Sequence, residues 1–163
     1  MALGVGLILL ALMSMLGLAA IRQTAWSARL AAHSFDQSIA FQVADSTLRD
    51  IESRLEQVKP EPTSGPCTDF LSGAISVRTC PPPAAPNKPR WLDSTFSAWS
   101  STTTVAQSAA SPTPYYFVEY LGNTFPCNAN TPPVLNCRRY RITVRVGTMG
   151  RAQAMLQSIY ATN

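Results

Sequence analysis

The feature that most constrains this chain is a long N-terminal stretch without charge or proline. Residues 1–21 are mostly Leu, Ala, Ile, Val and Met, and Arg22 is the first ionisable side chain. About 20 apolar residues in a helix span roughly 30 Å, the hydrocarbon thickness of a bilayer. The polar, proline-rich remainder could hardly enclose such a helix in a core. We therefore predict that residues 1–24 form a membrane-inserted helix.

The helical pattern continues beyond this stretch. Apolar side chains recur at spacings of three and four residues, which is typical of one face of an amphipathic helix. Pro60 and Pro62 end the pattern, so the helix would run for about 58 residues and roughly 87 Å. We expect residues 25–59 to pack this face on a globular head. The predicted face comprises Phe41, Ala44, Leu48, Ile51, Leu55 and Val58.

Residues 60–163 have the composition of a small β-rich head. Residues 60–114 are rich in Pro, Ser and Thr, which favours loops and turns. Residues 115–121 are aromatic and β-branched, residues 139–146 alternate between apolar and polar side chains, and residues 151–160 can continue a hairpin. We predict an α+β fold in which a small antiparallel sheet packs on the helix.

Trp91, Phe96 and Trp99 lie in the irregular part of the head. We expect these aromatic side chains to anchor the loops on the core. A ligand-binding aromatic cluster is the alternative.

The four cysteines all lie in the head. An even number in a small, loop-rich domain predicts disulfides and an oxidising compartment. Cys67 and Cys80 bracket twelve residues, and Cys127 and Cys137 bracket nine. We favour pairing between these neighbours, although four cysteines permit three connectivities. Neither pair has the spacing of a zinc site, so no metal is predicted.

The orientation of the chain in a membrane presents a conflict. Arg22 and Arg29 follow the apolar stretch, so the positive-inside rule alone would place the head in the cytoplasm. The cysteines argue for the opposite side. Both observations agree if a basic leader preceded Met1 and was removed. A cleaved secretory signal is disfavoured because the apolar stretch is longer than such signals and its helical pattern continues.

Motifs for catalysis are missing from the sequence. The single histidine, His33, lies on the long helix without a nucleophile near it, and there is no Gly-rich phosphate loop, GxSxG motif or metal-ligand cluster. We predict no enzymatic activity and no cofactor. Five arginines lie between residues 138 and 151, but strand alternation explains them more simply than a nucleic-acid patch. No specific nucleic acid is predicted as a partner.

The segment SIAFQVADSTLRDIE, residues 38–52, resembles the PilX family of type IV minor pilins, in which a similar stretch follows the membrane segment. The closing RYRITVRV and RAQAMLQSIY segments also look like that family's last strands. The resemblance implies the type IV pilin fold, with a leader removed by a prepilin peptidase and the new N-terminus, here Met1, methylated. It also implies a single-pass protein of the bacterial inner membrane, with its head in the periplasm, that later enters the pilus.

The family further implies partners. The helix would bundle with other minor pilins and with the major pilin in the filament core, and the subunit would join a tip complex that includes a large adhesin. The K-type minor pseudopilins of type II secretion are the related tip components.

Val5 departs from the general pilin pattern. Most pilins carry Glu at the fifth mature position, where its carboxylate pairs with the N-terminal amine of a neighbouring subunit. Val5 cannot make this pair, and no acidic residue occurs before Asp36. A filament's first subunit has no predecessor to dock under, so Val5 suits a tip position. PilX and K-type proteins share this absence.

Three functions are therefore open. The leading one is a non-enzymatic minor pilin that primes pilus assembly for adhesion, twitching motility or DNA uptake. The second is a minor pseudopilin of type II secretion, although K-type proteins usually carry a large inserted domain for which this chain has no room. The third is a single-pass membrane protein whose head binds a ligand. A short basic leader ending in Gly before Met1 would favour the pilins over the third.

Overall fold

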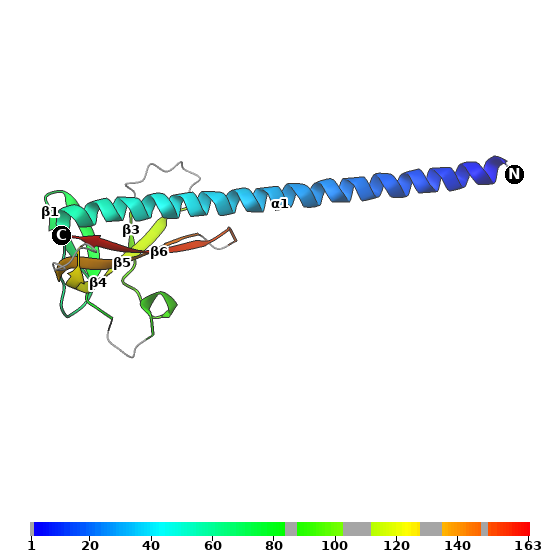
Figure 1. Cartoon of the computed structure of the whole chain (residues 1–163). Helices are drawn as coiled ribbons and strands as arrows, with labels where there is room; N and C mark the ends of the chain where they lie inside the picture. The colour runs from blue at the N-terminus through cyan, green and yellow to red at the C-terminus, as the bar shows by residue number, and fades with distance from the viewer. Residues whose placement is uncertain (1, 84–87, 103–111, 128–134, 148–149) are drawn as a thin grey trace. The chain divides into compact units, whose positions relative to one another are not determined.

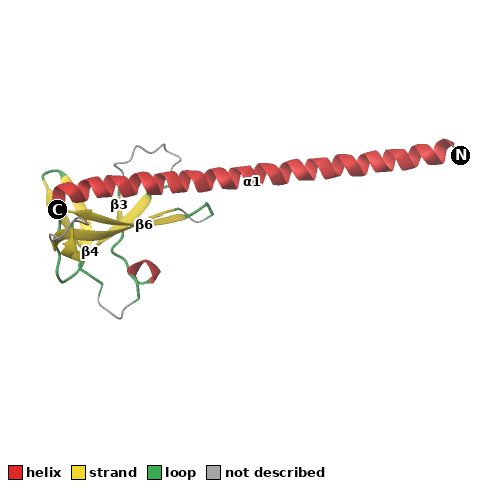
Figure 2. Cartoon of the chain, in the orientation of Figure 1, coloured by secondary structure: helices red, strands yellow, loops and turns green. Residues whose placement is uncertain are grey.

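The computed structural model describes residues 2–83, 88–102, 112–127, 135–147 and 150–163 (Figure 1). Within these residues a helix, α1 (Ala2–Val58), precedes a six-stranded sheet (Figure 2). Its strands are β1 (Thr68–Ser72), β2 (Ile75–Cys80), β3 (Ser100–Ser101), β4 (Pro114–Pro126), β5 (Leu135–Val146) and β6 (Ala154–Thr162), and a short 3-10 helix, η1, covers Arg90–Leu92. The chain divides into two compact units, residues 1–38 and 39–163.

The first unit is the N-terminal part of α1. Its described apolar side chains are widely exposed, for example Leu10 at 66%, Met13 at 72% and Trp26 at 74%. In the part of the chain that the structure describes, no helix combines the length and the apolar character that a bilayer span requires. The predicted insertion of residues 1–24 in a membrane is therefore not confirmed.

The second unit is built on the last part of α1. Ala44, Ile51 and Leu55 are completely buried, Leu48 is 9% exposed, and Val58 packs against the same core. The helix ends where Lys59 adopts a positive φ of 46°, immediately before Pro60. Proline has no backbone N–H to donate the next helical hydrogen bond, so the helix ends where the sequence predicts.

The assignment of Phe41 to the buried face is wrong. Its side chain is 54% exposed, whereas Ala40 and Val43 are buried. At about 100° per residue, Phe41 lies roughly 60° to one side of Ala44, while Ala40 and Val43 lie on the other side. The buried stripe therefore turns away from Phe41 at the first turn of the second unit.

The sheet has the order β1-β2-β4-β5-β6, with β3 pairing additionally with β4. Strands β4, β5 and β6 are antiparallel neighbours, as predicted. The expectation of a purely antiparallel sheet is wrong, since β2 and β4 are parallel and the sheet is mixed. The long connection from Cys80 to Pro114 explains this pairing, because parallel neighbours require a crossover that returns the chain to the starting end.

Alternation along the strands divides the sheet into two faces. Tyr116, Val118 and Tyr120 of β4 lie in the core with α1, as do Tyr140, Ile142 and Val144 of β5. The intervening residues point to the opposite face, which we call the far face. It carries Tyr115, Phe117 and Glu119 of β4, Arg139, Arg141, Thr143 and Arg145 of β5, and Met155, Gln157, Ile159 and Ala161 of β6.

Disulfide bonds, expected from the sequence, join Cys67 to Cys80 and Cys127 to Cys137. The first bond ties the residue before β1 to the last residue of β2, and the second joins the residue after β4 to β5. By the loop-closure estimate, each bond contributes on the order of 3 kcal/mol by restricting the unfolded chain.

The packing of α1 on the sheet generates a stability prediction. Ile51→Ala removes a completely buried side chain and leaves a cavity, so the free energy of unfolding should fall by about 2–5 kcal/mol. Denaturant unfolding of the full chain in detergent measures this loss. Phe41→Ala, at an exposed position of the same helix, is the control and should change stability by about 0.5 kcal/mol or less. Equal losses from the two variants would contradict the buried stripe described above.

Candidate functional site

The predicted functional residues do not come together in one place. Val5 belongs to α1, but its side chain and Met1 lie outside the described residues. The four cysteines lie at the strands of the head, in the other unit. Among the described residues, no group of three or more His, Cys, Asp or Glu side chains could hold a metal ion. The best-organised chemistry of the described part instead lies on the far face and at the end of α1.

Three arginines of β5 stack on aromatic rings of the far face. The guanidinium carbon of Arg139 lies 4.4 Å from the ring centre of Phe125, that of Arg141 lies 5.1 Å from Trp91, and that of Arg145 lies 4.0 Å from Trp99. Such contacts combine cation–π attraction with cover for the ring. The arginines of this strand are therefore engaged within the head, which agrees with the explanation by strand alternation.

The aromatic residues of the irregular stretch anchor it on the far face, as predicted for Phe96 and Trp99. The ring centre of buried Phe117 lies 4.8 Å from that of Phe96 and 4.7 Å from that of Trp99, and both pairs meet edge to face. This geometry is the favoured one for aromatic pairs. Arg145 also covers Trp99, so these rings take part in packing, and a hollow of about 420 Å³ adjoins them.

Glu119 supplies the charged part of this layer and was missed by the sequence reasoning. Its side chain is completely buried and pairs with Arg90 at 2.8 Å and with Arg141 at 3.3 Å. Arg90 also donates to the carbonyl oxygen of Pro81 at 2.9 Å. A buried carboxylate thus holds the loop after β2 onto β4 and β5. The available signal was a single acid inside an aromatic strand, directly across the sheet from Arg141.

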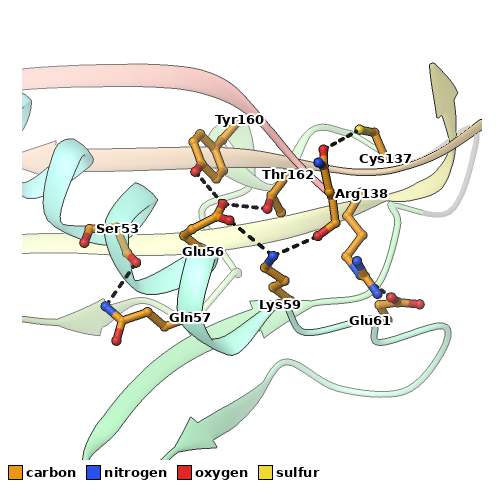
Figure 3. A network of polar contacts seen from close by, with 10 residues as sticks. Ser53, Glu56, Gln57, Lys59, Glu61, Cys137, Arg138, Tyr160 and Thr162 are labelled. Carbon is orange, nitrogen blue, oxygen red and sulfur yellow. Dashed lines mark hydrogen bonds and ion pairs between the residues drawn. The ribbon is translucent and has the colours of Figure 1, made fainter. Parts of the chain in front are cut away.

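A second polar cluster joins the end of α1 to the end of β6 (Figure 3). Glu56 accepts hydrogen bonds from the hydroxyls of Tyr160 at 2.9 Å and Thr162 at 2.5 Å, and it pairs with Lys59 at 3.2 Å. Lys59 Nζ also donates to the carbonyl oxygen of Asn163 at 2.8 Å. These contacts fix the last turn of the helix to the last strand.

The same cluster shifts two pKa values. The hydroxyls of Thr162 and then Tyr160 lower the pKa of Glu56 below its usual 4.5, because they stabilise the carboxylate. Burial, followed by the bond to Glu56, raises the pKa of Tyr160 to about 12. Glu61 continues the cluster beyond the helix, where it pairs with Arg138 and accepts from Asn123.

Comparison with known families gives two matches that together span almost the whole chain. The family described as PilX N-terminal matches residues 1–49. The family described as type IV pilus assembly protein PilX C-term matches residues 56–162. No curated protein and no solved structure matches the chain.

The buried charge cluster generates a second stability prediction. Glu119→Ala leaves Arg90 and Arg141 without their carboxylate, and because both arginines are partly exposed the loss should be about 3 kcal/mol, at the low end for a broken buried pair. Asp69→Ala is the matched control, since it removes an exposed Arg78 pair between neighbouring strands and should cost about 1 kcal/mol or less. Chemical unfolding of the full chain measures both. A smaller loss for Glu119→Ala than for Asp69→Ala would contradict the clamping role.

The lowered pKa of Glu56 predicts a pH dependence of stability. A carboxylate whose folded pKa is depressed stabilises the fold above its unfolded pKa, and this contribution disappears as the pH falls through the folded pKa. The stabilisation from Glu56 should be present above about pH 4.5 and be lost below it. Thermal unfolding from pH 7 to pH 3 compares the chain with Glu56→Gln. The difference in melting temperature should shrink toward acid, and a constant difference would contradict the assignment.

Proposed function

Because the chain belongs to the PilX family of type IV pilus assembly proteins, we propose that it is a minor pilin that primes the assembly of a type IV pilus. The observation that carries the proposal is the pair of family matches, which places an N-terminal and a C-terminal PilX segment in their expected order. The architecture of one long helix packed on a mixed sheet with two disulfides supports it.

The proposed architecture is that of a type IV pilin. Residues 1–24 form the half of the helix that inserts in the inner membrane and later in the filament core, residues 25–59 form the amphipathic half, and residues 60–163 form the head. Exposed leucines and methionines of α1, such as Leu10 and Met13, support a role for the first half among lipids or other helices. Apolar side chains of this number are unfavourable in water.

The proposed location of the head is the periplasm before assembly. Two disulfides in the head support this location, because structural disulfides form and persist in oxidising compartments. On leaving the membrane, the subunit would exchange lipid for the helices of other minor pilins and of the major pilin. Methylation of Met1 after removal of a leader belongs to the same proposal.

The proposed place in the filament is the tip. Val5 supplies no carboxylate to pair with the amine of an earlier subunit, and a lone charge within an apolar helix bundle would be costly. A subunit that starts the filament needs no such pair. At the tip it would meet a large adhesin. Because the pilus would not assemble without its first subunits, adhesion, twitching motility or DNA uptake by the pilus would depend on this chain.

Deletion of the gene tests the priming role. In cells whose pilus retraction is blocked, loss of this subunit should abolish or strongly reduce surface pili, because assembly lacks its first members. Electron microscopy and quantification of sheared pili measure the effect, and the gene supplied from a plasmid should restore piliation. Normal pili in the deletion strain would overturn the priming role.

Two further arms of the same experiment address the tip. An antibody to the head should label one end of the filament in immunogold images, and labelling along its length would count against a tip position. Complementation with Val5→Glu should still give pili. If this single change abolished the pili, assembly would require the absence of Glu at position 5. The argument that the first subunit simply has no earlier subunit to pair with would then fail.

A further inference from the structure

Among the strands that the structure describes, β6 forms one edge of the sheet. Its nine residues, AMLQSIYAT, pair with β5 and, within the described residues, with no other strand. The strand contains neither a charged residue nor a proline. Soluble proteins usually protect such edges with charge, proline, bulges or shortness, because the free backbone N–H and C=O groups can pair with another chain.

The apolar core is also incomplete at this edge. Tyr140, Ile142 and Val144 of β5 are completely buried, but their neighbours Ala154, Leu156 and Tyr160 of β6 are only partly covered. On the far face, Met155 is 51% exposed and Ile159 is 62% exposed. A hollow of about 400 Å³ adjoins the start of the strand, where Ala154 and Met155 contribute to its lining together with Arg145 and Gly147.

The flank of α1 beside β6 carries two carboxylates, of which Glu56 is already paired with Lys59 at 3.2 Å. Glu52 accepts a hydrogen bond from the hydroxyl of Ser158 at 2.9 Å, four residues before the Glu56 cluster described above. The exposed side chain of Phe41 lies on the same side of the helix, since eleven residues of helix place it within about 20° of Glu52. The edge is therefore bordered by an exposed aromatic ring and by the carboxylate of Glu52.

We propose that β6 receives an extended segment of another protein of the pilus, which adds to the sheet as a further strand. The segment would carry apolar side chains at alternate positions, against Met155 and Ile159, and a Lys or Arg that reaches Glu52. Backbone hydrogen bonds to an exposed edge supply affinity in this mode of recognition, and alternate side chains supply specificity. The inference rests on the proposed function for one point, namely that the partner is another protein of the pilus.

A second copy of this chain fits the edge less well. Glu52 bonds to Ser158 and Glu56 bonds to Thr162, so the end of α1 and β6 run in the same direction. Antiparallel pairing of two β6 strands would turn the two α1 helices in opposite directions. Subunits of one filament share a direction, and pairing centred on Ser158 would in addition bring two Glu52 carboxylates together.

Site-specific photo-crosslinking of the full chain in piliated cells tests the proposal. The photoreactive amino acid p-benzoylphenylalanine replaces Met155, Gln157 or Ile159 in three separate strains, and Leu71 of β1, 72% exposed at the opposite edge of the sheet, in a fourth. Mass spectrometry then identifies the linked peptides. The three β6 positions should link to one segment of one protein, with the attachment point moving by about two residues at each step, as paired strands require.

The chemistry of that segment and a blocking variant complete the test. The linked peptide should alternate in polarity and contain a basic residue. Ile159→Lys should reduce the crosslink from position 155 by about tenfold, equivalent to about 1.4 kcal/mol, whereas Leu71→Lys should leave it unchanged. Immunoblots confirm that each variant reaches the same cellular level. Scattered attachment points, a link to a second copy of this chain, or no link from β6 in normally piliated cells would overturn the proposal.

Failure of the strand-addition proposal can be distinguished from failure of the proposed priming function. If deletion abolishes pili but β6 forms no crosslink, the priming role stands and the strand-addition proposal is wrong. If deletion leaves pili normal, the priming role is wrong, while the pattern of crosslinks still decides whether β6 accepts a strand.

Discussion

The contact between the last five turns of α1 and the sheet is the interaction on which the rest of the head depends. Ile51 and Leu55 are completely buried against the tyrosine, isoleucine and valine side chains of β4 and β5. Burial of such side chains supplies most of the favourable free energy of a small domain. Among the described elements, β6 extends this core, and the loop after β2 covers the opposite side of the same sheet.

The far face follows a different physical principle from the core. There the sheet carries Glu119 and three arginines. The loop after β2 returns to pair Glu119 with Arg90 and to cover Arg141 and Arg145 with Trp91 and Trp99. A buried carboxylate is unfavourable unless it is paired and hydrogen-bonded, so this layer depends on geometry more than on apolar area. Apolar packing on one face and paired charge on the other together hold a sheet whose irregular connections are long.

The sequence predicts those parts of the structure that depend on residues close together in the chain, and not those that depend on residues far apart. The three-and-four spacing from Ala44 to Leu55 and the alternation in residues 139–146 are local, and both predict the buried faces found in the structure. The parallel pairing of β2 with β4 depends on where a long connection returns, which no local pattern specifies. Phe41 fits the spacing but lies where the buried stripe turns aside, and Glu119 gains its partners only when the sheet and the loop have formed.

The common direction of α1 and β6 has a mechanical consequence. A pull directed along the end of α1 would act on the Glu52–Ser158 and Glu56–Thr162 bonds, and on the apolar contacts between them, at the same time rather than one after another. Bonds loaded in shear share the force, whereas bonds loaded in an unzipping geometry break in turn. The head is therefore arranged to resist tension along its helix, and the segments enclosed by its two disulfides add no extension if part of the sheet yields.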